Sequence, residues 1–276
     1  MILVTGATGH VGGELTARLA AEGRPVRALV RKADGNALPA GVQSAVGDLG
    51  RPESLRTALE GVTAVFLLPG YADQPDILSE FRRAGVEHIV LLSSIAVPGG
   101  EMSNAISRFM ILSEQAVRAS GMPWTILRPS GFMSNTFQWQ AQLAAGDVVH
   151  APFAGVPIAM VDPYDIAAVA ARALHDEEHI GRSHALSGPE PLLPADRVRV
   201  LGGVLGRALR FEAQSDADAR KEMEGNTPPE YIDAFFRYYA DGTLDDSTVR
   251  PTVRELTGRP ARTFEDWAVA HADDFR

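Results

Sequence analysis

The residues that decide the fold are Thr5-Gly-Ala-Thr-Gly-His-Val-Gly-Gly13. They follow the apolar run Met1–Thr5 and precede the stretch Val11–Ala21, whose apolar residues have helical spacing. The first of three evenly spaced glycines permits a tight turn off the strand, the second lets the backbone approach a pyrophosphate, and the third lets the helix pack against the strand. The N-terminus of such a helix presents free N–H groups to the phosphates. The spacing predicts a dinucleotide-binding strand–turn–helix unit, the alternative being an ordinary tight turn.

Short apolar runs alternate with helical patterns over the first 130 residues. The runs are continuously apolar, which is typical of strands covered on both faces. Alternation at this spacing indicates βαβ units with right-handed crossovers. We therefore predict an α/β fold, a Rossmann-type doubly wound parallel sheet. The expected strands are Met1–Thr5, Val26–Val30, Gln43–Val46, Ala64–Leu68, Ile89–Leu92 and Thr125–Leu127, and the helices between them are Val11–Ala21, Ser54–Leu59, Ile77–Ala84 and Asn104–Ser120.

The pattern loosens after residue 130. A clear helix is expected at Asp165–His175, with Asp165 as its N-cap, and a proline-rich junction follows at Ser187–Pro194. We assign residues 1–130 plus 158–180 to the NAD(P)-binding Rossmann domain. Residues 131–157 plus 181–276 are assigned to a smaller, mostly helical domain on the substrate side. Its expected helices are Ala195–Leu205, Asp216–Glu224, Pro229–Ala240 and Phe264–Phe275.

The composition is that of an ordinary globular protein. The chain has 276 residues, a net charge of −9 and no cysteine. Without cysteine it forms no disulfide, iron–sulfur cluster or cysteine nucleophile, and we predict no metal site. The negative charge argues against nucleic-acid binding, and no apolar run approaches the ~20 residues that cross a bilayer. The N-terminus lacks the pattern of a signal peptide, so we expect a cytoplasmic protein with no membrane partner, either monomeric or homodimeric.

The end of the second strand favours NADP(H) over NAD(H). A carboxylate that reads the ribose hydroxyl is expected about 20 residues after the loop, but this strand ends in Arg31 and Lys32. These cations suit a 2′-phosphate, and arginine also stacks on adenine; the alternative is two solvated surface cations. Asp48, after the third strand, either accepts a hydrogen bond from the adenine amino group or caps a turn.

These features resemble the NmrA-like branch of the atypical short-chain dehydrogenase/reductases. The resemblance covers nearly the whole chain and implies a Rossmann domain, a small C-terminal substrate domain and a cleft between them. That family includes quinone and enal reductases, phenylpropanoid reductases and nicotinamide-sensing regulators that catalyse nothing. The matching pieces are the phosphate loop, Val30-Arg31, Gly47-Asp48, Ser93-Ser94, the stretch Glu114–Pro129, Asp162-Pro-Tyr-Asp-Ile166, Thr257-Gly-Arg-Pro260 and Thr263-Phe-Glu-Asp-Trp267.

The sequence departs from the mainstream short-chain reductases at the catalytic pair. Those enzymes use Tyr-x-x-x-Lys, in which the tyrosine gives a proton to the carbonyl oxygen. No tyrosine lies between Tyr71 and Tyr164 here, and neither of the two lysines lies on the helix Asn104–Ser120, where the motif belongs. Ile106 and Met110 stand in its place. The proton must therefore come from another source, and we expect it from the substrate or from water.

Other side chains are candidates for a catalytic role. Ser94, at the end of the fifth strand, either orients a carbonyl or bonds the backbone. Tyr71 follows the fourth strand and is expected to line the cleft. These two are the catalytic candidates. His150 is a weaker candidate for the substrate side, Asp165 is better explained as a helix cap, and Tyr238 and Tyr239 as core or lid packing.

The carboxyl ends of the strands define the rest of the expected site. An apolar pocket there suits a small apolar or aromatic substrate. The alternative is that each of these apolar residues is an ordinary core residue. The expected cofactor contacts are Gly6, Ala7, Thr8, Gly9, His10, Val11, Gly12, Arg31, Lys32, Asp48, Leu49, Leu68, Pro69, Ser93, Ser94, Pro129 and Phe132. The expected substrate pocket consists of Tyr71, Ile95, Met110, Phe132, Met133, Trp139 and Phe153.

Two functions of different classes fit this pattern. One is an NADPH-dependent reductase that transfers hydride to a quinone or an aromatic, polyketide-like carbonyl. Quinones need little help from an acid, because the reduced oxyanion is a stabilised phenolate. The other is a regulator that senses NADP(H) and acts through a protein partner, which the missing acid favours. An isomerase or lyase that uses the nucleotide structurally is a third possibility.

Overall fold

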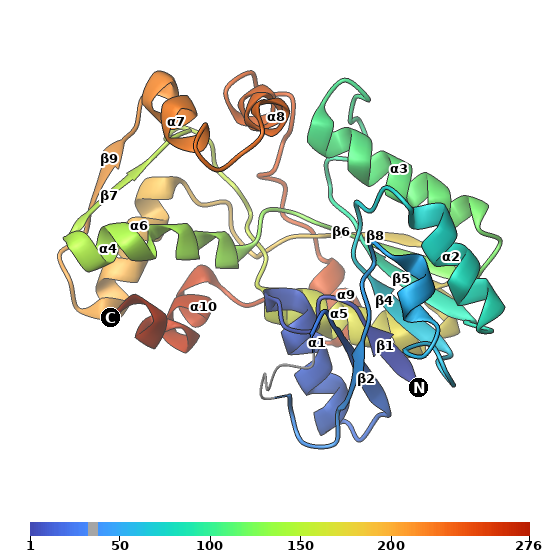
Figure 1. Cartoon of the computed structure of the whole chain (residues 1–276). Helices are drawn as coiled ribbons and strands as arrows, with labels where there is room; N and C mark the ends of the chain where they lie inside the picture. Colours follow the sequence, from blue (N-terminus) through green and yellow to red (C-terminus); the bar gives the residue numbers. More distant parts are fainter. Residues whose placement is uncertain (33–37) are drawn as a thin grey trace.

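A seven-stranded parallel sheet forms the centre of the computed structural model, which describes residues 1–32 and 38–276 (Figure 1). Its strand order is β3-β2-β1-β4-β5-β6-β8. All strands are parallel, but the chain adds β2 and β3 on one side of β1 and the later strands on the other side, so the strand order reverses between β1 and β4. Ligands bind beyond the carboxyl ends of the strands at such a reversal. The predicted Rossmann-type fold is confirmed. The strands are β1 (Ile2–Val4), β2 (Val26–Val30), β3 (Gln43–Val46), β4 (Ala64–Leu67), β5 (His88–Leu92), β6 (Trp124–Pro129) and β8 (Ser183–Leu186).

Helices cover both faces of the sheet, as continuous apolar strands require. One face packs on α1 (His10–Ala21), α5 (Pro163–His175) and α9 (Thr252–Thr257). The other face packs on α2 (Gln74–Arg83), α3 (Ala105–Ala119) and the 3₁₀ helix η1 (Pro52–Leu55). Each interface has its own apolar core, so the sheet is sealed on both sides and its functional surface is its edge.

A smaller unit lies beside the sheet, on the opposite side of Figure 1 from α2 and α3. Its core is built around the fully buried Trp139, Phe264 and Trp267. It contains a pair of parallel strands that the sequence analysis did not predict, β7 (Val148–Ala151) and β9 (Arg210–Ala213). Its helical elements are η2 (Met133–Trp139), α4 (Gln140–Ala145), α6 (Pro194–Leu205), α7 (Asp216–Met223), α8 (Pro229–Tyr239), α10 (Phe264–Ala270) and η4 (Ala272–Phe275).

Several expected boundaries are wrong. The helix expected at Ser54–Leu59 is the short η1, and the one expected at Phe264–Phe275 divides into α10 and η4. β8 pairs with β6 in the main sheet, and α9 packs on α5, although both segments were assigned to the smaller domain. The chain therefore passes between the sheet and the smaller unit more often than the sequence suggests.

The start of α5 binds the C-terminal part of the chain. Asp162, and not Asp165, is the N-cap: its Oδ1 accepts a hydrogen bond of 2.8 Å from the amide of Tyr164. Asp165 is fully buried and forms an ion pair of 2.6 Å with Arg259. Arg262 forms a further ion pair of 3.2 Å with Asp162. These contacts fasten the segment after α9 to the helix beneath the sheet.

Among the described residues, no helix is both long enough and apolar enough to cross a membrane.

Candidate functional site

The phosphate loop connects β1 to α1 at the centre of the sheet edge. Gly6 has a φ of 62°, a conformation that L side chains rarely adopt. A Cβ at Gly12 would lie 2.1 Å from the carbonyl oxygen of Gly6. The first turn of α1 is therefore pressed directly against the loop, and only glycine permits that contact.

The N-terminus of α1 suits an anion. Gly9 is the N-cap and provides no side-chain cap, and the first turn carries no acidic residue. Its backbone N–H groups are therefore left for an external acceptor. Thr8, Gly9 and His10 are exposed, whereas Ala7 and Val11 are buried in the core beneath them. The loop thus fits a pyrophosphate: buried side chains fix its backbone, and its surface consists of glycine and small or polar residues.

The adenine end of the expected site lies at the ends of β2 and β3. Arg31 and Lys32 are exposed there. Asp48 caps its own turn, because its Oδ1 accepts a 2.9 Å hydrogen bond from the amide of Gly50, and Leu49 is buried in the core. Of the two roles considered for Asp48, the structure shows the turn cap.

Tyr71 also lies near this end. Partial burial raises the pKa of its phenol, the Asp48 carboxylate adds to that rise, and the charge of Arg31 opposes it. The phenol thus interacts electrostatically with Asp48 and Arg31, and its ring packs against the apolar core on the α2 side of the sheet. The catalytic and pocket roles expected of Tyr71 stay predictions.

The ends of β4, β5 and β6 supply the next part of the edge. The amide of Leu68 donates a 2.9 Å hydrogen bond to Thr5, which ties the end of β4 to the phosphate loop. Ser93 is buried, and its hydroxyl donates to Glu114 at 2.7 Å. Ser94 remains partly exposed and accepts a 3.1 Å hydrogen bond from the amide of Ala96. Ser94 therefore stays available to a ligand, whereas Ser93 points into the protein.

Glu114, the first residue of the stretch Glu114–Pro129, organises a charge network that no motif in the sequence predicts. Arg128 binds it with two hydrogen bonds, of 2.8 and 2.6 Å, and Arg118 lies 3.4 Å away. Burial opposes ionisation, but the hydrogen bonds from Arg128 and Ser93 keep the pKa of Glu114 below its ordinary value. The network joins α3 to β5 and β6 and holds the strand ends in place.

Helix α8 packs against α3, the helix on which mainstream short-chain reductases carry the Tyr-x-x-x-Lys pair. Ile106 and Met110 of α3 are half-buried. Ser107, which follows Ile106, shares a 2.7 Å hydrogen bond with the hydroxyl of Tyr238 on α8. The side chain of Asn104, the cap of α3, reaches the carbonyl of Ala234 at 3.2 Å. Tyr238 is thus engaged in joining the two helices.

The expected apolar pocket is only partly supported. Met133 and Trp139 are each 1% exposed and belong to the core of the smaller unit, so they do not form an open wall. Phe132 and Ile95 are half-buried. Phe153 is half-buried too, and its ring contacts Phe236 and Tyr239 at centroid distances of 5.0 and 5.4 Å. Sequence patterns did not distinguish the buried aromatic residues from the accessible ones.

Tyr239, which contacts Phe153, belongs to a polar cluster with Asp246 and Gly131 that no sequence pattern predicted. Tyr239 donates a 3.2 Å hydrogen bond to Asp246, and the amide of Gly131, just after β6, lies 3.2 Å from the same oxygen. Asp246 is 4% exposed, and burial raises the pKa of its carboxyl to about 6. No sequence motif marks Asp246, because its partners come from distant parts of the chain.

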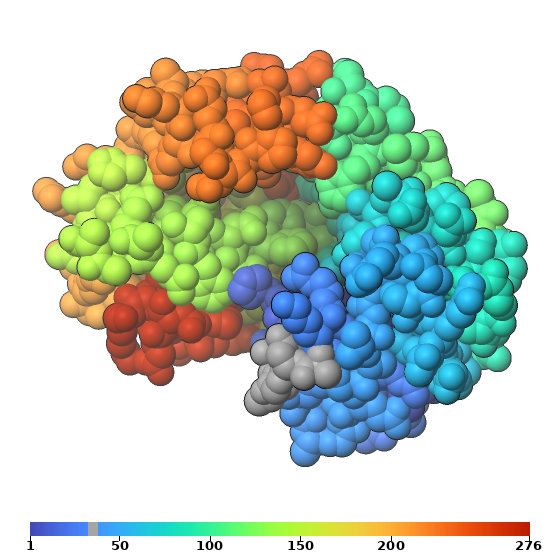
Figure 2. All heavy atoms as spheres, in the orientation of Figure 1, coloured from blue at the N-terminus to red at the C-terminus, as the bar shows by residue number. Residues whose placement is uncertain are grey.

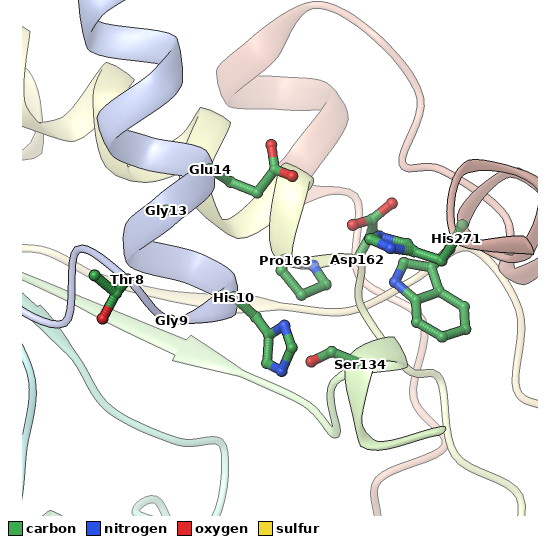
Figure 3. A pocket seen from close by; sticks show the side chains of 10 residues that line it. Thr8, Gly9, His10, Gly13, Glu14, Ser134, Asp162, Pro163 and His271 are labelled. Atoms are coloured by element: carbon green, nitrogen blue, oxygen red, sulfur yellow. The ribbon is translucent and has the colours of Figure 1, made fainter. Parts of the chain in front are cut away.

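A hollow lies at the first turn of α1, and the phosphate-loop residues Thr8 and Gly9 belong to its lining (Figure 3). Its volume is about 210 Å³, and His10, Glu14, Ser134, Asp162 and His271 contribute to its lining. The ring of His10 stacks on Phe137 of the smaller unit at 5.2 Å. The phosphate loop is thus in contact with both units.

Two histidines, His175 and His179, have the four-residue spacing of a helical metal site, which the expectation of no metal overlooked. Helix α5 ends at His175, so the two do not share a helix face. One ligand atom each from Asp176, Glu178 and His179 lies within 4.8 Å of the others. This cluster lies near the start of β6, at the edge of the sheet opposite the phosphate loop.

Comparison with known proteins finds relatives along the whole chain. A family model described as NAD(P)H-binding matches residues 6–177. The (4-alkanoyl-5-oxo-2,5-dihydrofuran-3-yl)methyl phosphate reductase of Streptomyces griseus is 44% identical over 280 residues, covering 100% of this chain and 99% of that protein. The NAD(P)H azoreductase of Xenophilus azovorans is 36% identical over 285 residues, with 100% and 99% covered.

Solved structures show the same fold. An NADPH-dependent quinone oxidoreductase from Escherichia coli superposes with a TM-score of 0.79 at 24% identity, covering 99% of this chain and 100% of that one. The Citrobacter sp. triphenylmethane reductase, complexed with NADP(H), gives a TM-score of 0.80 at 23% identity with the same coverage.

Proposed function

Because the chain belongs to the NAD(P)H-binding family, we propose that it is an NADPH-dependent reductase of a small, electron-poor conjugated acceptor, such as a quinone or an aromatic or unsaturated carbonyl compound. The observation that carries the proposal is the phosphate loop: Gly12 packs against the Gly6 backbone, and the N-terminus of α1 has no side-chain cap, so its N–H groups are left for a pyrophosphate. NADPH, when bound, supplies the hydride.

The residues of this chain would hold the nucleotide along the edge of the sheet. The amide of Gly9 donates a 2.9 Å hydrogen bond to the carbonyl of Gly6 and so fixes the turn. The exposed Thr8 and His10 would lie against the phosphates, and Arg31 and Lys32 would supply positive charge for a 2′-phosphate. Tyr71 adds a partly buried aromatic side chain near Arg31. The exposed cations Arg31 and Lys32 at the end of β2 support NADPH over NADH.

The missing Tyr-x-x-x-Lys pair restricts the acceptor. Without a tyrosine held near the acceptor by a lysine, a carbonyl whose reduced form is a high-pKa alkoxide is a poor substrate. An acceptor that delocalises the new negative charge, as a quinone does, needs only water or its own hydroxyl as the proton source. Ser94, still partly exposed at the end of β5, is suited to orient the acceptor by a hydrogen bond.

The names of the relatives agree with such an acceptor. They describe reduction of an acylated unsaturated lactone that carries a phosphate, of azo compounds, and of a quinone. These compounds share a double bond conjugated to electron-withdrawing or aromatic groups. We infer the same broad class for this chain.

The test is NADPH consumption by the purified protein, followed by absorbance. The panel contains menadione, aromatic ketones with and without a neighbouring hydroxyl, an azo dye, an acylated unsaturated lactone and, for comparison, an isolated aliphatic ketone. Gly12→Ala serves as the binding-deficient control. We expect turnover of at least one conjugated acceptor and none of an isolated aliphatic ketone. No turnover of any acceptor, in samples that bind NADPH tightly, would overturn the proposal and favour the sensing regulator.

A further inference from the structure

Arg197, on the first turn of α6, is buried without a partner. Its exposed fraction is 6%, and it forms no ion pair or hydrogen bond through its side chain with any residue in the described ranges 1–32 and 38–276. Buried arginines are ordinarily paired with a carboxylate. Even the partly buried Arg128 and Arg259 have such partners here, Glu114 and Asp165.

The guanidinium is held in place by an aromatic side chain. Its central carbon lies 5.0 Å from the centroid of the Trp139 ring, and Trp139 is itself 1% exposed. Burial lowers the pKa of Arg197 to about 10, so the group keeps its positive charge at neutral pH. The structure therefore maintains a fixed, charged and unneutralised donor inside the smaller unit.

Arg197 is connected to the carboxyl end of β6 through Tyr239 and Asp246. Arg197 couples electrostatically to the phenol of Tyr239, and Tyr239 is joined through Asp246 to the amide of Gly131, just after β6. Nε of Arg197 is sealed from solvent, whereas its two terminal nitrogens, also without hydrogen bonds, are not. Figure 2 shows the surface hollowed between the segment that carries α7 and α8 (orange) and the side of the molecule that carries the sheet.

We propose that Arg197 anchors an oxyanion of the substrate, a phosphate ester or a carboxylate, at the end of the substrate remote from the reacting double bond. The inference rests on the proposed function, because it assigns a substrate class to the same cleft. A guanidinium presents a planar pair of donors that matches either anion with two parallel hydrogen bonds. The stacked Trp139 fixes that plane before the substrate arrives.

The first experiment measures binding in the NADPH-saturated protein, so that the phosphate loop is already occupied. The probes are phenyl phosphate, benzoate and uncharged phenol, and the readout is the shift in Tm. We expect phenyl phosphate or benzoate, but not phenol, to raise the Tm of the wild type, and the stronger of the two identifies the anion. Arg197→Met should lose that shift. Arg199→Met is the matched control, since Arg199 lies on the same helix with its side chain 72% exposed.

The second readout separates an anchor from a structural arginine. Without any probe, Arg197→Met should unfold at a Tm equal to or above that of the wild type, because it removes a buried unpaired charge. Arg197→Lys provides a second variant that keeps the charge without the planar pair of donors, and it should retain a smaller shift. The proposal is overturned if Arg197→Met binds both anions as the wild type does, or if neither anion binds the wild type.

Kinetics distinguish failure of the anchor from failure of the proposed function. With a phosphate-bearing acceptor, Arg197→Met should raise KM by about 10- to 100-fold, as expected for the loss of a charged hydrogen bond, and leave KM for menadione unchanged. If no acceptor is reduced but the anion shift still depends on Arg197, the reductase fails and the anchor stands. If acceptors are reduced and KM for the anionic one does not change, the anchor fails and the reductase stands.

Discussion

The carboxylate of Asp165 lies fully buried at the start of α5, 2.6 Å from the guanidinium of Arg259 in the C-terminal segment. Its second oxygen accepts a 2.7 Å hydrogen bond from the amide of Arg262. The ring of Tyr164, between the two aspartates of α5, faces the guanidinium groups of Arg259 and Arg262 at 4.7 and 4.9 Å. The two stretches Asp162–Ile166 and Thr257–Pro260 thus bind each other.

Breaking this pair should destabilise the protein strongly. Arg259→Met leaves a buried carboxylate without its ion pair, and we expect a loss of about 3 kcal/mol in the free energy of unfolding. Urea denaturation measures it. Arg254→Met, at an exposed position of α9, should change little. The double variant Asp165→Asn with Arg259→Met should recover part of the loss, and full additivity of the two single losses would show that the residues are not coupled.

The glycines of the phosphate loop provide a matched pair of variants. A Cβ at Gly12 would lie 2.1 Å from a backbone oxygen, whereas a Cβ at Gly13 would lie 3.6 Å from one, an ordinary contact. We expect Gly12→Ala to displace α1 and to weaken NADPH binding by at least about 10-fold, and Gly13→Ala to bind normally. Calorimetric titration with NADPH measures both. Similar affinities of the two variants would refute the assigned role of the loop.

The charge at the end of β2 should determine the choice of nucleotide. Arg31→Glu is expected to weaken NADPH binding by about 10- to 100-fold, because a charged hydrogen bond to the 2′-phosphate is replaced by repulsion, and to change NADH binding far less. Arg24→Glu is the control, since Arg24 is exposed just before the opposite end of the same strand. Equal losses for both nucleotides would remove Arg31 from the 2′-phosphate site.

Asp246 should make stability depend on pH in the direction opposite to an ordinary paired aspartate. Burial raises its pKa from 3.8 to about 6 in the folded protein. Its contribution is therefore fully present below pH 3.8 and is lost as the pH rises through about 6, with a total amplitude of about 3 kcal/mol. Relative to Asp246→Asn, the wild type should gain stability as the pH falls.

Denaturation of both proteins across this pH range measures that gain. The neighbouring Asp245 is the control, because it is exposed and hydrogen bonds from Ser247 lower its pKa. Its contribution is lost as the pH falls, so Asp245→Asn should show a difference of the opposite sign. A constant difference between wild type and Asp246→Asn would contradict the assignment.

The sequence predicted β1, β4 and β5 because these strands are continuously apolar and are followed by glycine or serine, whereas β3 was predicted although it is mostly exposed. It failed at β8, where Ser183–Leu186 is a short edge strand with exposed or half-buried polar residues. It also chose the wrong cap for α5, although Pro163 at the first helical position indicates Asp162. Arg259 explains why Asp165 is buried, and a partner so distant in sequence leaves no local signal.

The candidate site divides in the same way. The phosphate loop is local, so its residues and their spacing could be predicted from the sequence. The proposed substrate side draws on η2, α6, α8 and the loop that carries Asp246, and no periodicity shows that Trp139 is buried while Phe153 is partly accessible. Arg197 looked like any helical surface arginine, because the absence of its partner is visible only in three dimensions.

The route of the chain has a consequence for its synthesis. After β6 the chain enters the smaller unit, returns to the sheet as α5 and β8, leaves as α6, returns as α9 and leaves again as α10. A nascent chain that emerges from the ribosome therefore cannot complete one part before beginning the other. Until α9 has been made, the face of α5 that it covers stays open and Asp165 has no counter-charge. A product whose translation stops shortly before residue 252 should thus lack contacts in both the sheet and the smaller unit, so neither part would be fully folded. Quality-control proteases would remove it.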